Sequence, residues 1–113
     1  MPSISVNITT PCFNEPVANN IVAAGTTNEL LDTPGAITIS SVSVQFGEGG
    51  PVVAASPGSE DLSTWNCSGV APGTSGTQAK LTATARGRFL PQGSHPATAR
   101  NVTASNAVFV TLV

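Results

Sequence analysis

Charged side chains are scarce in this sequence. They make up 9% of the 113 residues, whereas soluble domains usually carry about 25%. The four basic residues are Lys80, Arg86, Arg88 and Arg100, and they form no run long enough to neutralise a series of phosphates. The formal net charge is −2. We therefore expect no nucleic-acid partner, and a surface covered mainly by hydroxyl and amide groups.

Long apolar runs are missing as well. No stretch of about 20 apolar residues occurs, so we expect no membrane insertion. Met1 and Pro2 lead straight into a strand-like alternation, without the charged and apolar regions of a signal peptide. The abundance of Gly, Pro, Ser, Thr, Ala and Val is typical of secreted β-rich domains, which predicts an extracellular or cell-surface location. Either a leader has been removed or the domain has been excised from a larger protein, and we favour excision.

Residues suited to catalysis or metal binding are few. The sole histidine, His95, lies in a Gly-Ser-His-Pro segment, and no Gly-x-Ser-x-Gly motif accompanies it. The acid pairs are Glu60-Asp61 and Glu29 with Asp32. They could act as glycosidase carboxylates or calcium ligands, but we interpret them as solvated loop charges or turn caps, which need no such role. Without C-x-x-C or His/Cys clusters we expect no zinc, and we predict no catalytic residue, metal or cofactor.

Only two cysteines occur, Cys12 and Cys67. They allow a single intramolecular disulfide, which would stabilise the fold by about 4 kcal/mol in the chain-entropy model. The alternative is a pair of buried, reduced thiols. We predict the disulfide.

Aromatic residues are rare too: the chain has no Tyr, four Phe and one Trp. An indole can stack on a sugar ring, so Trp65 could anchor a carbohydrate. It shares a strand face with Cys67, however, and a lone inward Trp in a β-sandwich usually fills the core. We therefore predict that Trp65 is a core residue, because a sugar-binding aromatic platform is hard to assemble from so few rings.

What the sequence does contain is period-two alternation in short segments broken by Gly and Pro. Ala79, Leu81, Ala83 and Ala85 face one way in the clearest segment. Seven strands are expected: Ser3–Thr10, Asn20–Thr27, Ala36–Phe46, Pro51–Ala55, Leu62–Val70, Thr77–Arg88 and Ser105–Val113. The phase of the last stays open, because Val108, Val110 and Leu112 compete with Phe109 and Val113. The predicted core includes Trp65, Leu81, Val42, Val44 and Ile8.

The third of these segments changes phase within itself. Ile37 and Ile39 fall at odd positions, whereas Val42, Val44 and Phe46 fall at even positions. A regular strand cannot bury both sets, because a slip of one residue turns every side chain to the other face. We predict a β-bulge at Ser40-Ser41, since a bulge inserts the one extra residue that is needed.

Seven short strands separated by turn signals predict a fold class. The chain is expected to be all-β, an immunoglobulin-like Greek-key β-sandwich of about seven strands, in a single domain over residues 1–113. No window has the apolar stripe of a helix. The segments Asn28–Gly35 and Leu90–Thr98 are predicted to be long loops, and Gln92, Ser94 and His95 in the second are candidate binding residues.

Four segments carry a family resemblance. They match, in order, the first strand, the middle hairpin, a Trp-containing segment and the penultimate strand of the family: Val6–Pro11, Ile39–Val44 with Gly49–Val52, Trp65–Gly73, and Gly76–Ala85. Through them nearly the whole chain resembles the bacterial immunoglobulin-like, or fibronectin type III-like, domains of secreted enzymes and surface adhesins. The acidic turn that often follows the penultimate strand is replaced here by Ala85–Phe89, and relatives usually lack cysteines.

The resemblance implies a role without catalysis. We expect an accessory or spacer module of a secreted or surface multidomain protein, whose partners are the neighbouring domains. The alternative is a carbohydrate- or protein-binding module of the adhesin type, which would use its end loops or an exposed strand edge.

Overall fold

The computed structural model describes residues 3–10, 14–17, 20–32, 34–58, 62–93 and 99–113. These residues contain nine β-strands and no helix, and hence none long and apolar enough to cross a membrane. The strands are β1 (Ser3–Thr10), β2 (Asn14–Glu15), β3 (Ile21–Leu30), β4 (Gly35–Phe46), β5 (Val52–Ala54), β6 (Ser56–Pro57), β7 (Thr64–Gly69), β8 (Gln78–Pro91) and β9 (Arg100–Leu112). β2 and β6, of two residues each, are additional to the seven predicted strands.

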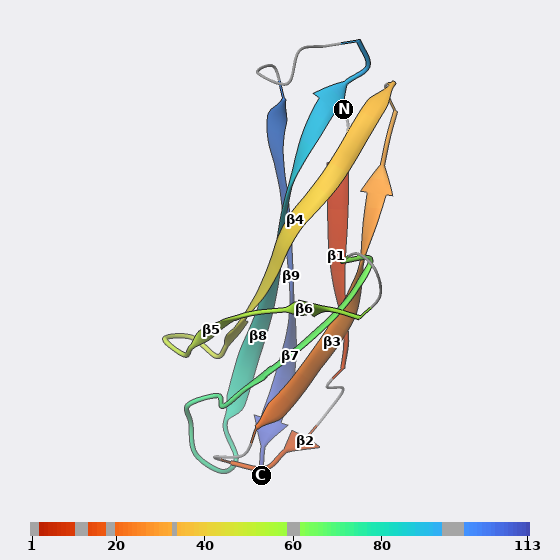
Figure 1. The fold of residues 1–113 in the computed structure, drawn as a ribbon. Helices are drawn as coiled ribbons and strands as arrows, with labels where there is room; N and C mark the ends of the chain where they lie inside the picture. The colour runs from red at the N-terminus through yellow and green to blue at the C-terminus, as the bar shows by residue number, and fades with distance from the viewer. Residues whose placement is uncertain (1–2, 11–13, 18–19, 33, 59–61, 94–98) are drawn as a thin grey trace.

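The strands form two sheets that face each other (Figure 1). One has the order β1-β3-β7-β6, and the other has the order β2-β9-β8-β4-β5. All pairings are antiparallel except that of β2 with β9. The predicted all-β, two-sheet sandwich is therefore confirmed.

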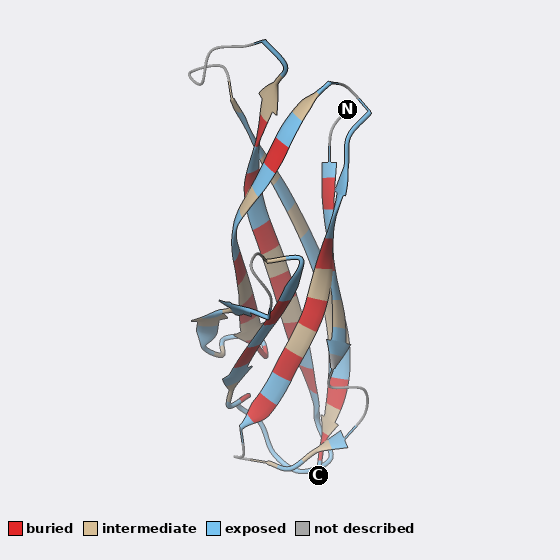
Figure 2. Ribbon diagram, turned by 45° about the vertical axis from the view of Figure 1, so that its right-hand side comes forward, coloured by how far each residue is buried: buried red, intermediate tan, exposed pale blue. Residues whose placement is uncertain are grey.

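Burial alternates along the long strands, as Figure 2 shows by its bands of buried and exposed residues. Successive side chains of a strand point to opposite faces, so one face of each sheet supplies the core. The predicted core residues Trp65, Leu81, Val42 and Val44 are all buried, while Ile8 is half-buried and packs against the core.

The bulge predicted in the third segment is confirmed. The register of β4 against β8 shifts between Ile39 and Ser41, and the Ser40 hydroxyl donates to the Arg86 carbonyl oxygen at 3.0 Å. Because of this extra residue, Ile37 before the shift and Val42 after it are both buried.

Three predicted boundaries are wrong by three residues or more, each because a strand is longer than its sequence pattern indicates. β3 continues to Leu30, since Asn28, Glu29 and Leu30 pair with the first residues of β1. β8 continues to Pro91 because Leu90 and Pro91 pair with Ala36 and Gly35 of β4. β9 begins at Arg100 because residues 100–104 pair with residues 85–89 of β8. Ladder hydrogen bonds use backbone groups, so a strand can extend without apolar side chains.

The sequence left open which side chains of the last strand face the core, and their burial decides it. Val110 and Leu112 are buried, whereas Phe109 and Val113 are more than half exposed. The alternation of β9 therefore directs Val110 and Leu112 inward and Phe109 outward.

The molecule is elongated, with principal extents of 54 × 24 × 20 Å. Ser3 at the start of β1 pairs with Leu30, near the first residue of β4. Leu112 at the end of β9 lies at the opposite pole, beside β2 (Figure 1). The described chain thus begins at one end of the long axis and finishes at the other.

Candidate functional site

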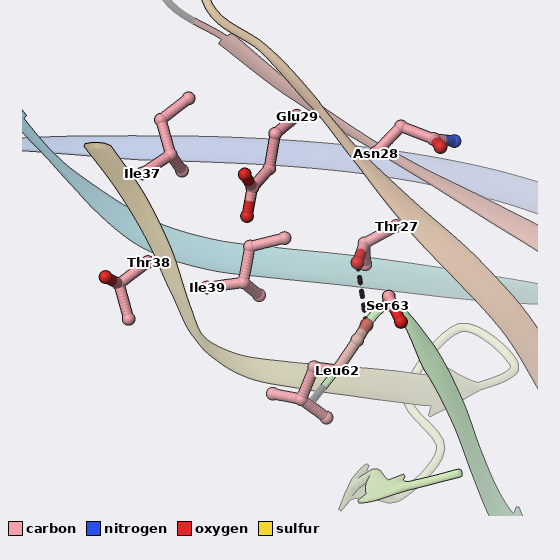
Figure 3. Close-up of a pocket in the computed structure, with 8 residues that line it drawn as sticks. All are labelled: Thr27, Asn28, Glu29, Ile37, Thr38, Ile39, Leu62 and Ser63. Carbon is pink, nitrogen blue, oxygen red and sulfur yellow. Dashed lines mark hydrogen bonds between the residues drawn. The ribbon is translucent and has the colours of Figure 1, made fainter. Parts of the chain in front are cut away.

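A groove opens between the two sheets on the side where β3 and β4 lie. β7 begins at Thr64 and pairs with β3 only up to Thr26, while β5 pairs with β4 only over Ser43–Gln45. Both strands thus keep an open edge towards the Ser3 pole among the described residues. The space between them is about 410 Å³ and is lined by eight residues (Figure 3): Thr27, Asn28, Glu29, Ile37, Thr38, Ile39, Leu62 and Ser63.

Thr27 lines this groove and joins β3 to the segment before β7 through hydrogen bonds. Its hydroxyl donates to the Leu62 carbonyl oxygen at 2.6 Å, the dashed line in Figure 3. Its backbone N–H donates to the Ser63 carbonyl oxygen at 3.0 Å. These two bonds hold the segment before β7 against β3, and the first of them satisfies the hydroxyl of Thr27, a residue that is 5% exposed. Half-buried Ile39 and Leu62 add apolar surface beside it.

Glu29 is the one ionisable side chain among the eight lining residues. It has the inward phase of β3 but is exposed, and β7, which pairs with β3 only up to Thr26, does not flank it. Its carboxylate points from β3 towards β4 in Figure 3. Glycoside hydrolysis commonly employs two carboxyl groups, and the described lining of the groove supplies one.

The free edge of β4 is the most distinctive element of the groove. From Gly35 to Ser41, no described strand pairs with β4 on the side away from β8. The outward side chains here, Ala36, Thr38 and Ser40, are small and uncharged. Natural edges are usually protected by charge, proline or a covering element, so this edge is geometrically open to an added strand.

The predicted binding loop is only partly described. Gln92 is exposed, and its backbone N–H donates to the Pro34 carbonyl oxygen at 3.0 Å. That bond joins the end of β8 to the turn before β4. Ser94 and His95 lie outside the described residues.

The two acid pairs singled out in the sequence are not assembled into a site among the described residues. Glu29 belongs to β3 and not to a loop, and Asp32 follows that strand without lining the groove. Glu60 and Asp61 lie outside the described residues. In the described part of the chain, no three His, Cys, Asp or Glu side chains gather as metal ligands would.

The predicted disulfide is wrong. Cys67 is a free, buried thiol on the core face of β7, while Cys12 lies outside the described residues. Burial raises the pKa of the Cys67 thiol.

Trp65 lies in the core and not on a binding surface. It is 1% exposed, and its indole Nε1 has no hydrogen-bond partner. Trp65 pairs across the strands with Gly25, so the ring covers a position without a side chain.

The groove could not be read from the sequence, because it joins residues far apart along the chain. Thr27, Ile39 and Leu62 meet only through sheet packing. The phase change at Ser40 was the one local signal, since it turned Ile37 and Ile39 inward. A comparison of the chain with protein-family models and with curated proteins finds no match.

Proposed function

We propose that this chain is a non-catalytic spacer module of a secreted or surface multidomain protein, built as an immunoglobulin-like sandwich. The observation that carries the proposal is its shape: a body 54 Å long in which β1 begins at one pole and β9 ends at the other. A module with this geometry sets its neighbours about one domain length apart and contacts them through its ends.

The strand order supports the immunoglobulin-like topology. In that fold one sheet has the order A-B-E-D and the other contains C, F and G, with C′ added in some members. Assigning β1, β3, β7 and β6 to A, B, E and D reproduces the first sheet. Assigning β9, β8, β4 and β5 to G, F, C and C′ reproduces the second, to which β2 adds a short strand.

The absence of a catalytic role is part of the proposal. It is supported by the single carboxylate in the described lining of the groove and by the use of the Thr27 hydroxyl in a structural hydrogen bond.

A tandem of two copies tests the spacer role. With a short direct junction, small-angle X-ray scattering should give a maximum dimension of about twice the 54 Å length of one copy. A matched tandem joined by a long Gly/Ser linker should give a broader distance distribution, because such linkers are flexible. A directly joined tandem that folds back to the length of one copy would contradict the proposal.

Protein binding through the free β4 edge is the second candidate, favoured by the groove beside Ile37 and Ile39. Peptides selected on the protein from a random display library should then bind as an added strand. Thr38→Lys places a charge on the edge and should abolish binding. Thr84→Lys adds the same charge to the central strand β8 and should leave it intact, so peptides insensitive to Thr38→Lys would exclude this candidate.

A further inference from the structure

The positive charge of this acidic protein is concentrated on one face. Every second residue of β8 is buried from Ala79 to Phe89, and the residues between them are intermediate or exposed. Lys80, Arg86 and Arg88 are all exposed. Their phase is opposite to that of buried Leu81 and Phe89. Three of the four basic residues therefore point outward from the five-stranded sheet.

No acidic side chain opposes them within the described strands of that sheet. The strands contain one acid, Glu15 of β2, which pairs with buried Leu112 and so has the inward phase. The outward positions of β4 and β9 carry mostly Ser, Thr, Asn, Gln and Ala. The face is thus positive and rich in hydroxyl and amide groups, although the whole chain has a net charge of −2.

Two of the cations frame a groove on this face. Arg86 pairs across the strands with Thr103, and Arg88 pairs with Asn101. Together with Ser40 of β4 they line a space of about 300 Å³. A guanidinium can bind a carboxylate or sulfate through two parallel hydrogen bonds, and the neighbouring hydroxyl and amide groups can bond to uncharged polar groups of the same ligand.

Lys80 adds a third positive charge, farther along β8 from Arg86 and Arg88. It lies six residues before Arg86 on the same face of β8, a separation of about 20 Å. Phe109 stands opposite Lys80 on β9 and is 59% exposed. A flat ring next to a cation offers an apolar face for stacking at the far end of the line.

We propose that the outer face of the five-stranded sheet binds a linear acidic polysaccharide, one that carries carboxylate or sulfate groups and lies along β8. Three cations in line suit a chain with widely spaced charges, whereas duplex DNA needs many phosphate contacts. A protein partner would require an apolar centre, which this polar face does not offer. This binding role is independent of the spacer role and can fail or succeed without it.

Titration calorimetry with polygalacturonate, heparin, neutral dextran and duplex DNA tests the proposal and separates carboxylate from sulfate as the ligand group. We expect at least one acidic polymer to bind, with affinity falling as salt rises, and dextran not to bind. Arg86→Gln combined with Arg88→Gln should weaken binding at least about tenfold. Arg100→Gln is the matched control, because Arg100 pairs with buried Phe89 and has the inward phase; its effect should stay within about twofold.

The length of the site is tested by Lys80→Gln. This variant should weaken binding of the acidic polymer but not of its trisaccharide, which is too short to span the roughly 20 Å from Arg86 to Lys80. A thermal unfolding midpoint equal to that of the wild type checks that each variant is folded. The proposal is overturned if neither acidic polymer binds, or if dextran or duplex DNA binds as tightly as the acidic polymers do. It is also overturned if Arg100→Gln weakens binding as much as the double variant, or if Lys80→Gln weakens binding of the polymer and of the trisaccharide alike.

Discussion

At the scale of single residues, the interior is organised around the pair of Trp65 and Gly25. The two residues face each other across β3 and β7. A Cβ atom at position 25 would lie 2.5 Å from Cζ2 of the indole and would also overlap the Asn7 carbonyl oxygen of β1. The largest core side chain therefore fits only because its neighbour has no side chain.

Gly25→Ala should consequently destabilise the fold. Rigid backbone and a buried ring leave the new methyl group little room, and overpacking of this kind typically costs about 1–3 kcal/mol. Urea unfolding measures the loss. Thr26→Ala, at the next position of β3 and on its outer face, should cost less than about 1 kcal/mol, and equal losses for the two variants would disprove the packing argument.

Cys67 should make stability depend on pH. Burial raises the pKa of its thiol in the folded state, so the folded protein holds this proton at a pH where the unfolded chain has lost it. The resulting stabilisation is complete below the ordinary thiol pKa of about 8.5 and is lost as the pH rises through the folded-state value.

The measurement compares two variants in a background with one thiol. Denaturant unfolding of Cys12→Ser between pH 7 and pH 10 should show a steeper loss of stability than Cys12→Ser/Cys67→Ala. If the stabilities of the two variants fell equally with pH, the Cys67 thiol would titrate alike in the folded and unfolded states, which would contradict this prediction.

At the scale of elements, some features could be predicted from the sequence and others could not. The bulge at Ser40-Ser41 was predictable, because Ile37 and Val42 cannot both face inward on a regular strand. The extension of β3 through Glu29 was not, because it depends on pairing with β1 and leaves no apolar pattern. The Cys12–Cys67 bridge was predicted wrongly, because a count of cysteines carries no information on the specific geometry that a disulfide needs.

Deleting Ser40 tests the function of the bulge in β4. Without the extra residue, either Ile37 and Ile39 or Val42 and Val44 turn to solvent, which should cost at least about 3 kcal/mol. Thermal or urea unfolding gives the loss. One glycine inserted after Gly49, in the β4–β5 hairpin where an added Cβ would contact nothing within 4 Å, should cost less than about 1 kcal/mol; a harmless deletion of Ser40 would contradict the bulge.

At the scale of the whole molecule, the long strands determine the shape. β4, β8 and β9 contain 12, 14 and 13 residues, about twice the usual strand length. They extend the five-stranded sheet beyond β7 towards the Ser3 pole, which opens the groove at Thr27 and lengthens the cationic outer face. The proposed spacer role and both candidate binding surfaces therefore rest on one feature, the elongation of the sandwich.

Small-angle X-ray scattering of the isolated chain tests this elongation most directly. The structure has a Cα radius of gyration of 15.8 Å, whereas an average compact domain of this length has about 13 Å. We predict a measured value near 16 Å and a maximum dimension near the 54 Å extent. A radius of gyration near 13 Å would contradict the extended sandwich and the spacer role that rests on it.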